Sequence, residues 1–380
     1  MRAGESPVKL TATKSNLANA LAVAARVATS SSALQAAQGA LIDATGAGAL
    51  VSATDFDTSI TLPVVTESID TPGRVLLPAR LLLDVVKACP GTTVTISLTG
   101  DSPARIESGS ARFDLRPLRI EDFPTLPKPD PATTSQLPLA PFIAAIDRVA
   151  DSASRDESRP LLTGVNIRVT GTHLRAVATD SYRLAVYQTD LDAPATREFQ
   201  RTLPARALQE LAKLSKVAGA EHLTISEAGS NFVMQFASIT LATRTISGDY
   251  PNADQLIPTE CEFSVTYPAD TLNETIRRVA LLCQNNTPAI LAFNGVGLEC
   301  RADTADIGSA AEVIEDIRHD GSPFTIGINP DFLTQALAQY GGDSVEMRLL
   351  SPLRPMMLTD ATGKLSQILM PIRLNTPNGG

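Results

Sequence analysis

One short pattern occurs three times along the chain, and the spacing between its copies is constant. Leu77-Pro78-Ala79-Arg80 returns as Leu203-Pro204-Ala205-Arg206, and a related stretch follows at Asn329-Pro330-Asp331. In both intervals, 126 positions separate the prolines. Self-similarity at a fixed period is typical of an array of one structural unit. The chain is therefore predicted to contain three copies of one domain.

Two further markers keep nearly the same period. Ala53-Thr54-Asp55 recurs as Ala178-Thr179-Asp180, and Asp122-Phe123-Pro124 recurs as Asp249-Tyr250-Pro251. A chain of 380 residues is long enough for three domains that each bury a core. The predicted domains span residues 1–127, 128–258 and 259–380.

Each copy is expected to contain two helices and about eight short strands. Ser15 is the predicted N-cap of a helix over 16–28, and Asp270 is the predicted N-cap of the first helix in the third copy. The repeated proline is expected to begin the second helix, where its missing N–H costs nothing. Apolar residues over 174–187 predict one long strand. The predicted fold class is α+β, with two helices packed on antiparallel sheet in each copy.

Composition and motifs restrict the possible functions. The formal net charge of −9 argues against a tight nucleic-acid binder, unless the positive charge gathers on one face. The three histidines lack metal-ligand spacing, and no nucleophile or phosphate-binding motif is present, so neither metal, cofactor nor catalytic residues are expected. The start of the chain lacks a secretory segment, and no apolar run could cross a bilayer, which predicts a cytoplasmic protein.

Several segments resemble the bacterial sliding clamp, the β subunit of DNA polymerase III. They are Arg159-Pro160-Leu161-Leu162-Thr163-Gly164, the stretch from Ala178 through Asp180-Ser181-Tyr182-Arg183 to Leu184, and Leu369-Met370-Pro371-Ile372-Arg373-Leu374. The resemblance covers nearly the whole chain in order and includes the threefold repeat. It implies a non-enzymatic processivity factor, a head-to-tail homodimer that closes into a ring around duplex DNA. The implied partners are DNA bound without sequence preference, the polymerase α subunit, the clamp loader and other proteins with a clamp-binding motif.

The resemblance also implies a groove for partner peptides between the second and third domains. Apolar side chains would form its walls, and a few polar groups would fix the orientation of the peptide. The residues at matching positions are Leu162, Thr179, Ser181, Tyr182, Arg183, Leu184, Pro251, Gln255, Leu256, Phe332, Pro355, Leu369, Met370, Pro371, Ile372 and Arg373.

Two other surfaces are expected from the same resemblance. Basic side chains on the helices would attract phosphates without reading bases. The candidates are Arg26, Arg80, Lys87, Arg148, Arg206, Lys213, Lys216, Arg277 and Arg278. Ring closure would join an edge of the first domain to the opposite edge of the third. The candidate interface residues are Arg112, Phe113, Leu281, Leu282, Asp303 and Asp306.

Three alternative functions remain open at this stage. The stretches 33–39, 195–201 and 351–354 fit the resemblance poorly, which is compatible with a specialised second clamp copy, such as an inhibitor-resistant variant in an antibiotic producer. A monomeric peptide-binding adaptor would use the groove without closing a ring. An enzyme on a triplicated scaffold is supported only by the carboxylate pairs Asp55/Asp57 and Asp303/Asp306.

Overall fold

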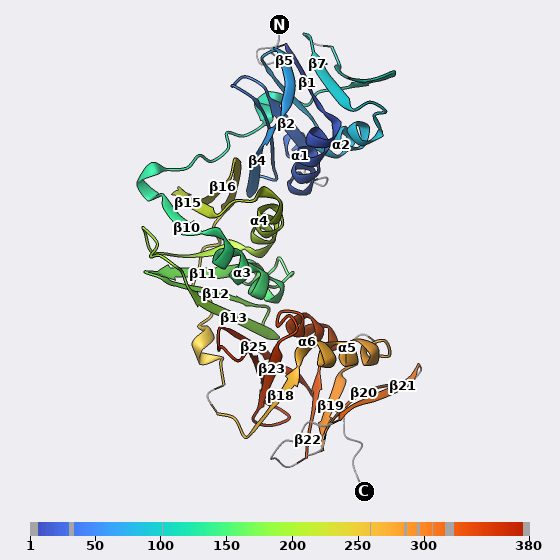
Figure 1. Cartoon of the computed structure of the whole chain (residues 1–380), viewed down its shortest axis with the longest axis vertical. Coiled ribbons are helices and arrows are strands. Elements are labelled where there is room, and N and C mark those ends of the chain that lie inside the picture. The colour runs from blue at the N-terminus through green and yellow to red at the C-terminus, as the bar shows by residue number, and fades with distance from the viewer. Residues whose placement is uncertain are drawn as a thin grey trace. The chain divides into compact units, whose positions relative to one another are not determined.

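The computed structural model describes residues 7–29, 34–100, 102–258, 260–284, 287–294, 297–305, 307–315 and 323–374 (Figure 1). The chain divides into two compact units. The first unit comprises Met1–Leu139 with Leu214–Thr245, and the second comprises Ala140–Lys213 with Ile246–Gly380. Each unit is built on two antiparallel sheets, one of eight strands and one of five.

In the first unit, helices α1 (Lys14–Val27) and α2 (Ala79–Ala88) pack against each other, and α1 covers strands β3 (Ala49–Thr54) and β4 (Thr58–Val64). The five-stranded sheet has the order β5 (Thr66–Thr71), β1 (Val8–Thr13), β7 (Thr93–Leu98), β8 (Ala104–Ser108), β9 (Ala111–Leu115). The eight-stranded sheet has the order β10 (Ser135–Pro138), β15 (His222–Ala228), β16 (Asn231–Phe236), β17 (Ile239–Arg244), β4 (Thr58–Val64), β3 (Ala49–Thr54), β2 (Gly39–Asp43), β6 (Arg74–Pro78).

In the second unit, helices α5 (Ala269–Ala280) and α6 (Pro330–Leu337) pack against each other. Helices α3 (Leu139–Val149) and α4 (Ala205–Ala218) belong to the second copy, and the division between the two units falls within α4, after Lys213. The eight-stranded sheet has the order β14 (Phe199–Pro204), β11 (Gly164–Thr170), β12 (His173–Thr179), β13 (Arg183–Asp190), β25 (Leu365–Leu369), β24 (Met356–Thr359), β23 (Ser344–Leu349), β18 (Phe263–Pro268). The five-stranded sheet has the order β21 (Gly308–Glu315), β20 (Gly297–Thr304), β19 (Ala289–Phe293), β22 (Phe324–Ile328), β26 (Pro371–Ile372).

Short 3₁₀ turns lie in the connections between these elements. They are η1 (Gln35–Gln38), η2 (Ile120–Asp122), η3 (Pro131–Thr133), η4 (Ala150–Ser152), η5 (Pro160–Thr163) and η6 (Ala253–Gln255). The described elements confirm the predicted fold class, with two helices per copy on antiparallel sheet.

The helix starts differ from two of the predicted caps. Thr13, not Ser15, caps α1, and its hydroxyl accepts the N–H of Asn16 at 3.4 Å. Helix α5 begins at Ala269 directly after Pro268, so Asp270 lies in its first turn and is not the cap. In both cases a strand runs straight into the helix, so the cap is the last residue of the strand and comes earlier than the apolar pattern indicates.

The predicted strand over 174–187 is wrong in one respect. It is two strands, β12 and β13, which pair antiparallel around a tight turn at Asp180-Ser181-Tyr182. Apolar residues continue on both sides of the turn, so the pattern alone does not reveal where the chain reverses.

Each eight-stranded sheet joins strands from two successive copies. In the first unit, β4 of the first copy pairs with β17 of the second, and Thr58 lies opposite Thr243. In the second unit, β13 of the second copy pairs with β25 of the third, and Arg183 lies opposite Leu369. Thr58 and Arg183 each follow the repeated threonine, Thr54 or Thr179, by four positions. The two junctions therefore use the same register.

Candidate functional site

The turn between β12 and β13 is built by the repeated Ala-Thr-Asp marker. The Asp180 carboxylate accepts the backbone N–H groups of Tyr182 and Arg183, both at 2.9 Å. The Thr179 hydroxyl donates to the Arg183 carbonyl at 2.6 Å. Ser181 is held at a φ of 79°, in the left-handed region that costs a non-glycine residue about 1–3 kcal/mol. The turn therefore presents the Ser181 and Tyr182 side chains to solvent.

The first copy repeats this construction. The Asp55 carboxylate accepts the N–H groups of Asp57 at 3.1 Å and Thr58 at 2.7 Å, and Phe56 has a φ of 75°. Asp55 is thus engaged as a turn-forming residue. This arrangement accounts for Asp55 without a catalytic role.

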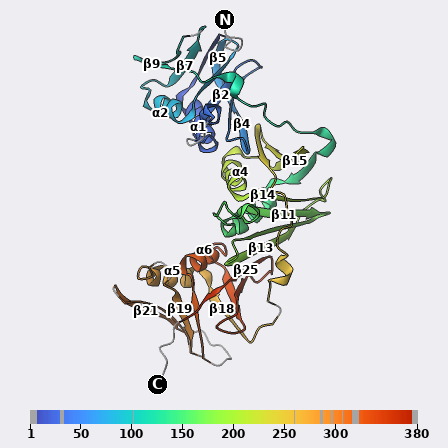
Figure 2. The ribbon, with the colours of Figure 1, turned by 180° about the vertical axis from the view of Figure 1, so that it is seen from behind.

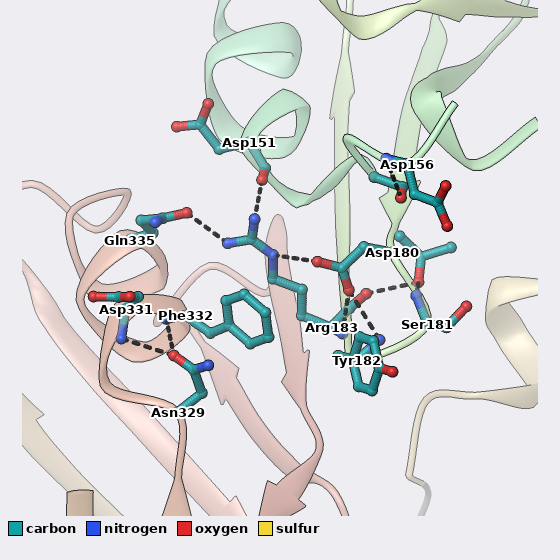
Figure 3. A network of polar contacts seen from close by, with 12 residues as sticks. Asp151, Asp156, Asp180, Ser181, Tyr182, Arg183, Asn329, Asp331, Phe332 and Gln335 are labelled. Atoms are coloured by element: carbon teal, nitrogen blue, oxygen red, sulfur yellow. Dashed lines mark hydrogen bonds and ion pairs between the residues drawn. The ribbon is translucent and has the colours of Figure 1, made fainter. Parts of the chain in front are cut away.

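Arg183 ties this turn to the third copy (Figure 3). Its Nε donates to the Asp180 carboxylate at 3.0 Å, one terminal nitrogen donates to Gln335 Oε1 at 2.7 Å, and the other donates to the Asp151 carbonyl. The guanidinium carbon lies 4.5 Å from the centre of the Phe332 ring, which is cation–π geometry. The Arg183 and Asp180 side chains are only 9% and 11% exposed.

Apolar side chains are exposed around this network. Tyr182 is 61% exposed, Leu256 is 50% exposed and Met370 is 44% exposed. The Met370 N–H donates to the Tyr182 carbonyl at 2.9 Å, which places these two side chains on neighbouring segments. Exposed large apolar residues gathered in one region are typical of an interaction surface.

The structure brings many of the predicted groove residues together. Pairing of β13 with β25 places Arg183 and Leu184 beside Leu369, and Met370 follows at the end of β25. Pro371 and Ile372 form β26 against β22, and Pro355 directly precedes β24. Three of the predicted residues, Thr179, Leu184 and Leu369, are buried, so they support the surface from below. Leu162, Ser181, Pro251, Gln255 and Arg373 are half-buried or exposed.

The linker after the second copy covers the floor of the same region. Tyr250 and Ile257 pack with Ala253 against a cluster that contains Val177, Val186 and Leu184. The Tyr250 hydroxyl accepts the Thr179 N–H at 3.1 Å and donates to the Gly164 carbonyl at 3.2 Å. Burial raises the pKa of Tyr250 to about 12, so the phenol stays neutral and can keep donating.

Four residues that hold this site in place were not in the predicted set. Asp180 fixes the turn, Asp151 and Gln335 bind Arg183, and Tyr250 bonds to the strand end. The sequence could have pointed to two of them, because Asp180 and the aromatic residue at the position of Tyr250 both recur in the repeat. Gln335 lies 152 positions from Arg183, and no local pattern links them.

The predicted DNA-facing residues have different environments. Arg26, Arg80, Lys87, Arg206, Lys213, Lys216 and Arg277 are exposed. Arg278 donates to Glu312 at 2.6 Å and 2.8 Å, and these bonds hold its pKa above the usual value. Arg148 is half-buried and lines a small cavity with Phe332 and Gln367, beside the Arg183 network. The charges of Arg278 and Arg148 are therefore less available to a distant phosphate.

The candidate interface residues lie near two open sheet edges. Arg112 and Phe113 lie on β9, an outer strand of the first five-stranded sheet, and Asp303 lies on β20 beside the outer strand β21. Leu281 is 81% exposed just beyond α5, and Leu282 is half-buried. Asp306 lies outside the described residues. Two unpredicted apolar residues, Ile307 and Val313, are also exposed at the β21 edge.

Within the described ranges, no helix is long and apolar enough to cross a membrane. The same residues contain no group of three or more histidine, cysteine, aspartate or glutamate side chains placed to hold a metal ion.

Comparisons with known proteins agree with this architecture of three repeated clamp domains. The N-terminal, central and C-terminal domain models of the DNA polymerase III β subunit match residues 8–127, 136–252 and 254–373. The beta sliding clamp of Streptomyces coelicolor is 30% identical over 97% of this chain and 100% of its own length.

Solved structures give the same result. The sliding clamp of Bacillus subtilis superposes with a TM-score of 0.87 at 25% identity, over 97% of this chain and 100% of its own. A Pseudomonas aeruginosa sliding clamp bound to griselimycin has the same fold, with a TM-score of 0.87 at 23% identity and the same coverage of both chains.

The fold and the repeat define a protein of the DNA-clamp class. The chain belongs to the DNA polymerase III β subunit family, the beta sliding clamps. Proteins of this family are sliding clamps, the processivity factors of DNA polymerase III.

Proposed function

We propose that this chain is a non-catalytic processivity ring, a head-to-tail homodimer that encircles duplex DNA. Its three domains would follow the repeat, with boundaries at 127/128 and 258/259. The end of the N-terminal family model at 127 supports the first boundary, whereas the C-terminal model begins at 254, ahead of the second. In the bacterial cytoplasm it would tether the polymerase α subunit, receive the clamp loader and bind other proteins with a clamp-binding motif.

The order of strands supports the proposed closure. Each copy contributes two sets of four neighbouring strands. The first set has the order β6-β2-β3-β4 in the first copy, β14-β11-β12-β13 in the second and β22-β19-β20-β21 in the third. The second set has the order β1-β7-β8-β9, β10-β15-β16-β17 and β18-β23-β24-β25. Because β4 pairs with β17 and β13 with β25, the described sheets leave β21 and β9 with one open edge each. An open edge is a template for pairing with another chain. The third junction would therefore form between two chains, with β21 of one against β9 of the other.

The repeat also specifies the register of that junction. In the third copy Gly308 pairs with Thr304, as Ser59 pairs with Thr54 in the first copy. Ile307, which precedes Gly308, therefore holds the position of Thr58, which precedes Ser59. On the other edge, β9 begins at Ala111 and β17 at Ile239, each directly after a two-residue hairpin turn. Leu115 and Thr243 each lie four residues further on, so they hold the same position. Ile307 of one chain is therefore expected opposite Leu115 of the other. This pairing would cover the apolar residues that are exposed beside β21.

The single observation that carries the function is the family membership over the whole chain, including all three domains. Topological binding is tested with a nicked circular duplex onto which the protein has been loaded. The protein is expected to stay on the circle at a salt concentration that screens phosphate contacts, and to leave once the circle is cut. Equal retention on circular and linear DNA would contradict encirclement.

We propose that the exposed surface around Tyr182 and Met370 is the peptide groove. Met370→Ala with Pro371→Ala is expected to weaken binding of griselimycin, the ligand of the Pseudomonas clamp, by about 1–3 kcal/mol, as for loss of interface anchors. Isothermal titration measures this loss. Val65→Ala, at an apolar residue that is 69% exposed in the first unit, serves as the control.

The same titration, combined with the mass of the particle from sedimentation, separates the alternative functions. Equal affinity of the double variant and the parent chain would contradict the groove assignment. A stable dimer that does not bind griselimycin would favour a specialised, inhibitor-resistant clamp. A single-chain particle that still binds it would favour the peptide-binding adaptor.

A further inference from the structure

A second cavity lies in the first unit, under the linker that leaves the first copy. Figures 1 and 2 show this linker and α1 on opposite sides of the eight-stranded sheet of the first unit. The cavity has a volume of about 440 Å³, within the usual size range of ligand pockets. One wall is the linker from Phe123 to Pro129, and the floor is the outer face of β2, β3, β4 and β17.

The floor of the cavity is a single row across four strands. Leu41 is the register partner of Ser52, Ser52 of Thr61, and Thr61 of Thr240. The Ser52 and Thr61 hydroxyls hydrogen-bond to each other at 2.9 Å, so the centre of the row is short and already satisfied. Leu50, one pleat away on β3, is 41% exposed and faces the cavity.

The corresponding place in the second unit is filled. By the 125-residue spacing of the Ala-Thr-Asp marker, Ser52 corresponds to Val177 and Thr61 to Val186. Those two valines are buried in a cluster with Ala253, and Ile257 of the linker packs on it. At the first junction the two central floor positions, Ser52 and Thr61, carry hydroxyl groups in place of these valines, and the linker leaves the space open.

The linker wall is held at a distance from the floor. Phe123 packs with Ile120 and Leu41 at one end, and Pro124, Pro127 and Pro129 follow. Prolines favour extended backbone and give a stiff segment, so this wall resists collapse onto the sheet. The opening is thus a property of the sequence of the linker.

Two cations lie at the cavity. Arg74 and Lys128 are exposed, and within the described residues neither forms an ion pair. One carboxylate, that of Asp43, also lines the cavity, and it accepts the N–H of Thr45 at 3.0 Å and its hydroxyl at 2.6 Å. The cavity therefore combines apolar walls with an excess of positive charge.

We propose that this cavity is a second docking site, which takes an extended peptide segment of a partner protein that carries an apolar side chain next to an acidic one. The apolar side chain would enter between Leu50 and the linker prolines, where it meets no unsatisfied polar group on the floor. The acidic side chain would lie beside Arg74 and Lys128. The site is separate from the proposed groove, because all of its lining residues belong to the first unit.

The test is a selection of displayed random seven-residue peptides on the full chain, followed by titration of the enriched sequences. Sequences that join an apolar residue to aspartate or glutamate are expected to appear. They should lose about tenfold or more in affinity on Leu50→Glu and on Arg74→Glu, as for loss of an anchor or a charge partner. They should bind the Met370→Ala, Pro371→Ala variant as they bind the parent chain.

Two outcomes would overturn the proposal. One is that no enriched peptide is sensitive to Leu50→Glu, or that all of them depend on Met370 and Pro371. The other is that the peptides sensitive to Leu50→Glu are basic or uncharged. Both substituted positions are exposed, and equal urea midpoints of variant and parent chains would show that the fold is unchanged.

Discussion

Replacing Leu281 and Ile307 together by aspartate is expected to turn the proposed dimer into single chains of 40.1 kDa. Both side chains are exposed in the free chain, at 81% and 45%, so the substitutions leave its core intact. In the proposed interface the same two positions are covered. Each new carboxylate would then lose its water without gaining a partner. The dissociation constant should rise at least about 100-fold, or about 3 kcal/mol.

Analytical ultracentrifugation measures the change in mass, and retention on a nicked circle measures its consequence. The control is Val217→Asp, which places the same charge on an apolar residue that is 88% exposed at the end of α4. The control should remain dimeric and stay on the circle. A double variant that sediments as the parent chain does would show that the β21 edge is not part of the interface.

The sequence predicted which segments form helices better than it predicted where each helix begins. Helical periodicity located all six described helices, since each buries one apolar stripe. It placed the caps at Ser15 and Asp270, because serine and aspartate are good caps in isolation. The actual caps, Thr13 and Pro268, depend on where the preceding strand leaves its sheet, and that position is set by packing between segments.

The pairing between copies could not be read from the pattern. Strands β4 and β17 are about 180 positions apart, and no residue in either strand marks the other as its partner. The repeat shows that the copies are alike, but it does not show that neighbouring copies share a sheet. Once one junction is known, however, the repeat predicts the register of the next, as the agreement of β4–β17 with β13–β25 demonstrates.

The candidate site was predicted only in part for a related reason. Arg183 was identified by resemblance, but its partners come from η4 and α6 as well as from the adjacent turn. A guanidinium offers several donors in one plane, so a single arginine can hold three segments at once. Which segments it holds is decided by the tertiary fold. The sequence indicated the residue, and the structure identified what it binds.

Arg183→Met is expected to lower the free energy of unfolding by about 3–5 kcal/mol, the range measured when one partner of a buried ion pair is removed. Methionine keeps an apolar contact with Phe332 but leaves the Asp180 carboxylate, which is 11% exposed, without its cation. The Gln335 amide oxygen and the Asp151 carbonyl lose their donor as well. Urea unfolding of the full chain, followed by circular dichroism, measures the loss.

Arg175→Met provides the matched control, since it removes an arginine from the adjacent strand and breaks one ion pair, with Asp254. Asp254 is 65% exposed and keeps its water, so this change should cost about 1 kcal/mol or less. Adding Asp180→Asn to Arg183→Met should recover part of the lost stability, because the amide removes the buried charge that the first substitution left unpaired. If Arg183→Met and Arg175→Met unfold at the same urea concentration, burial does not strengthen the Arg183 pair, and the junction between the second and third copies is held by the sheet alone.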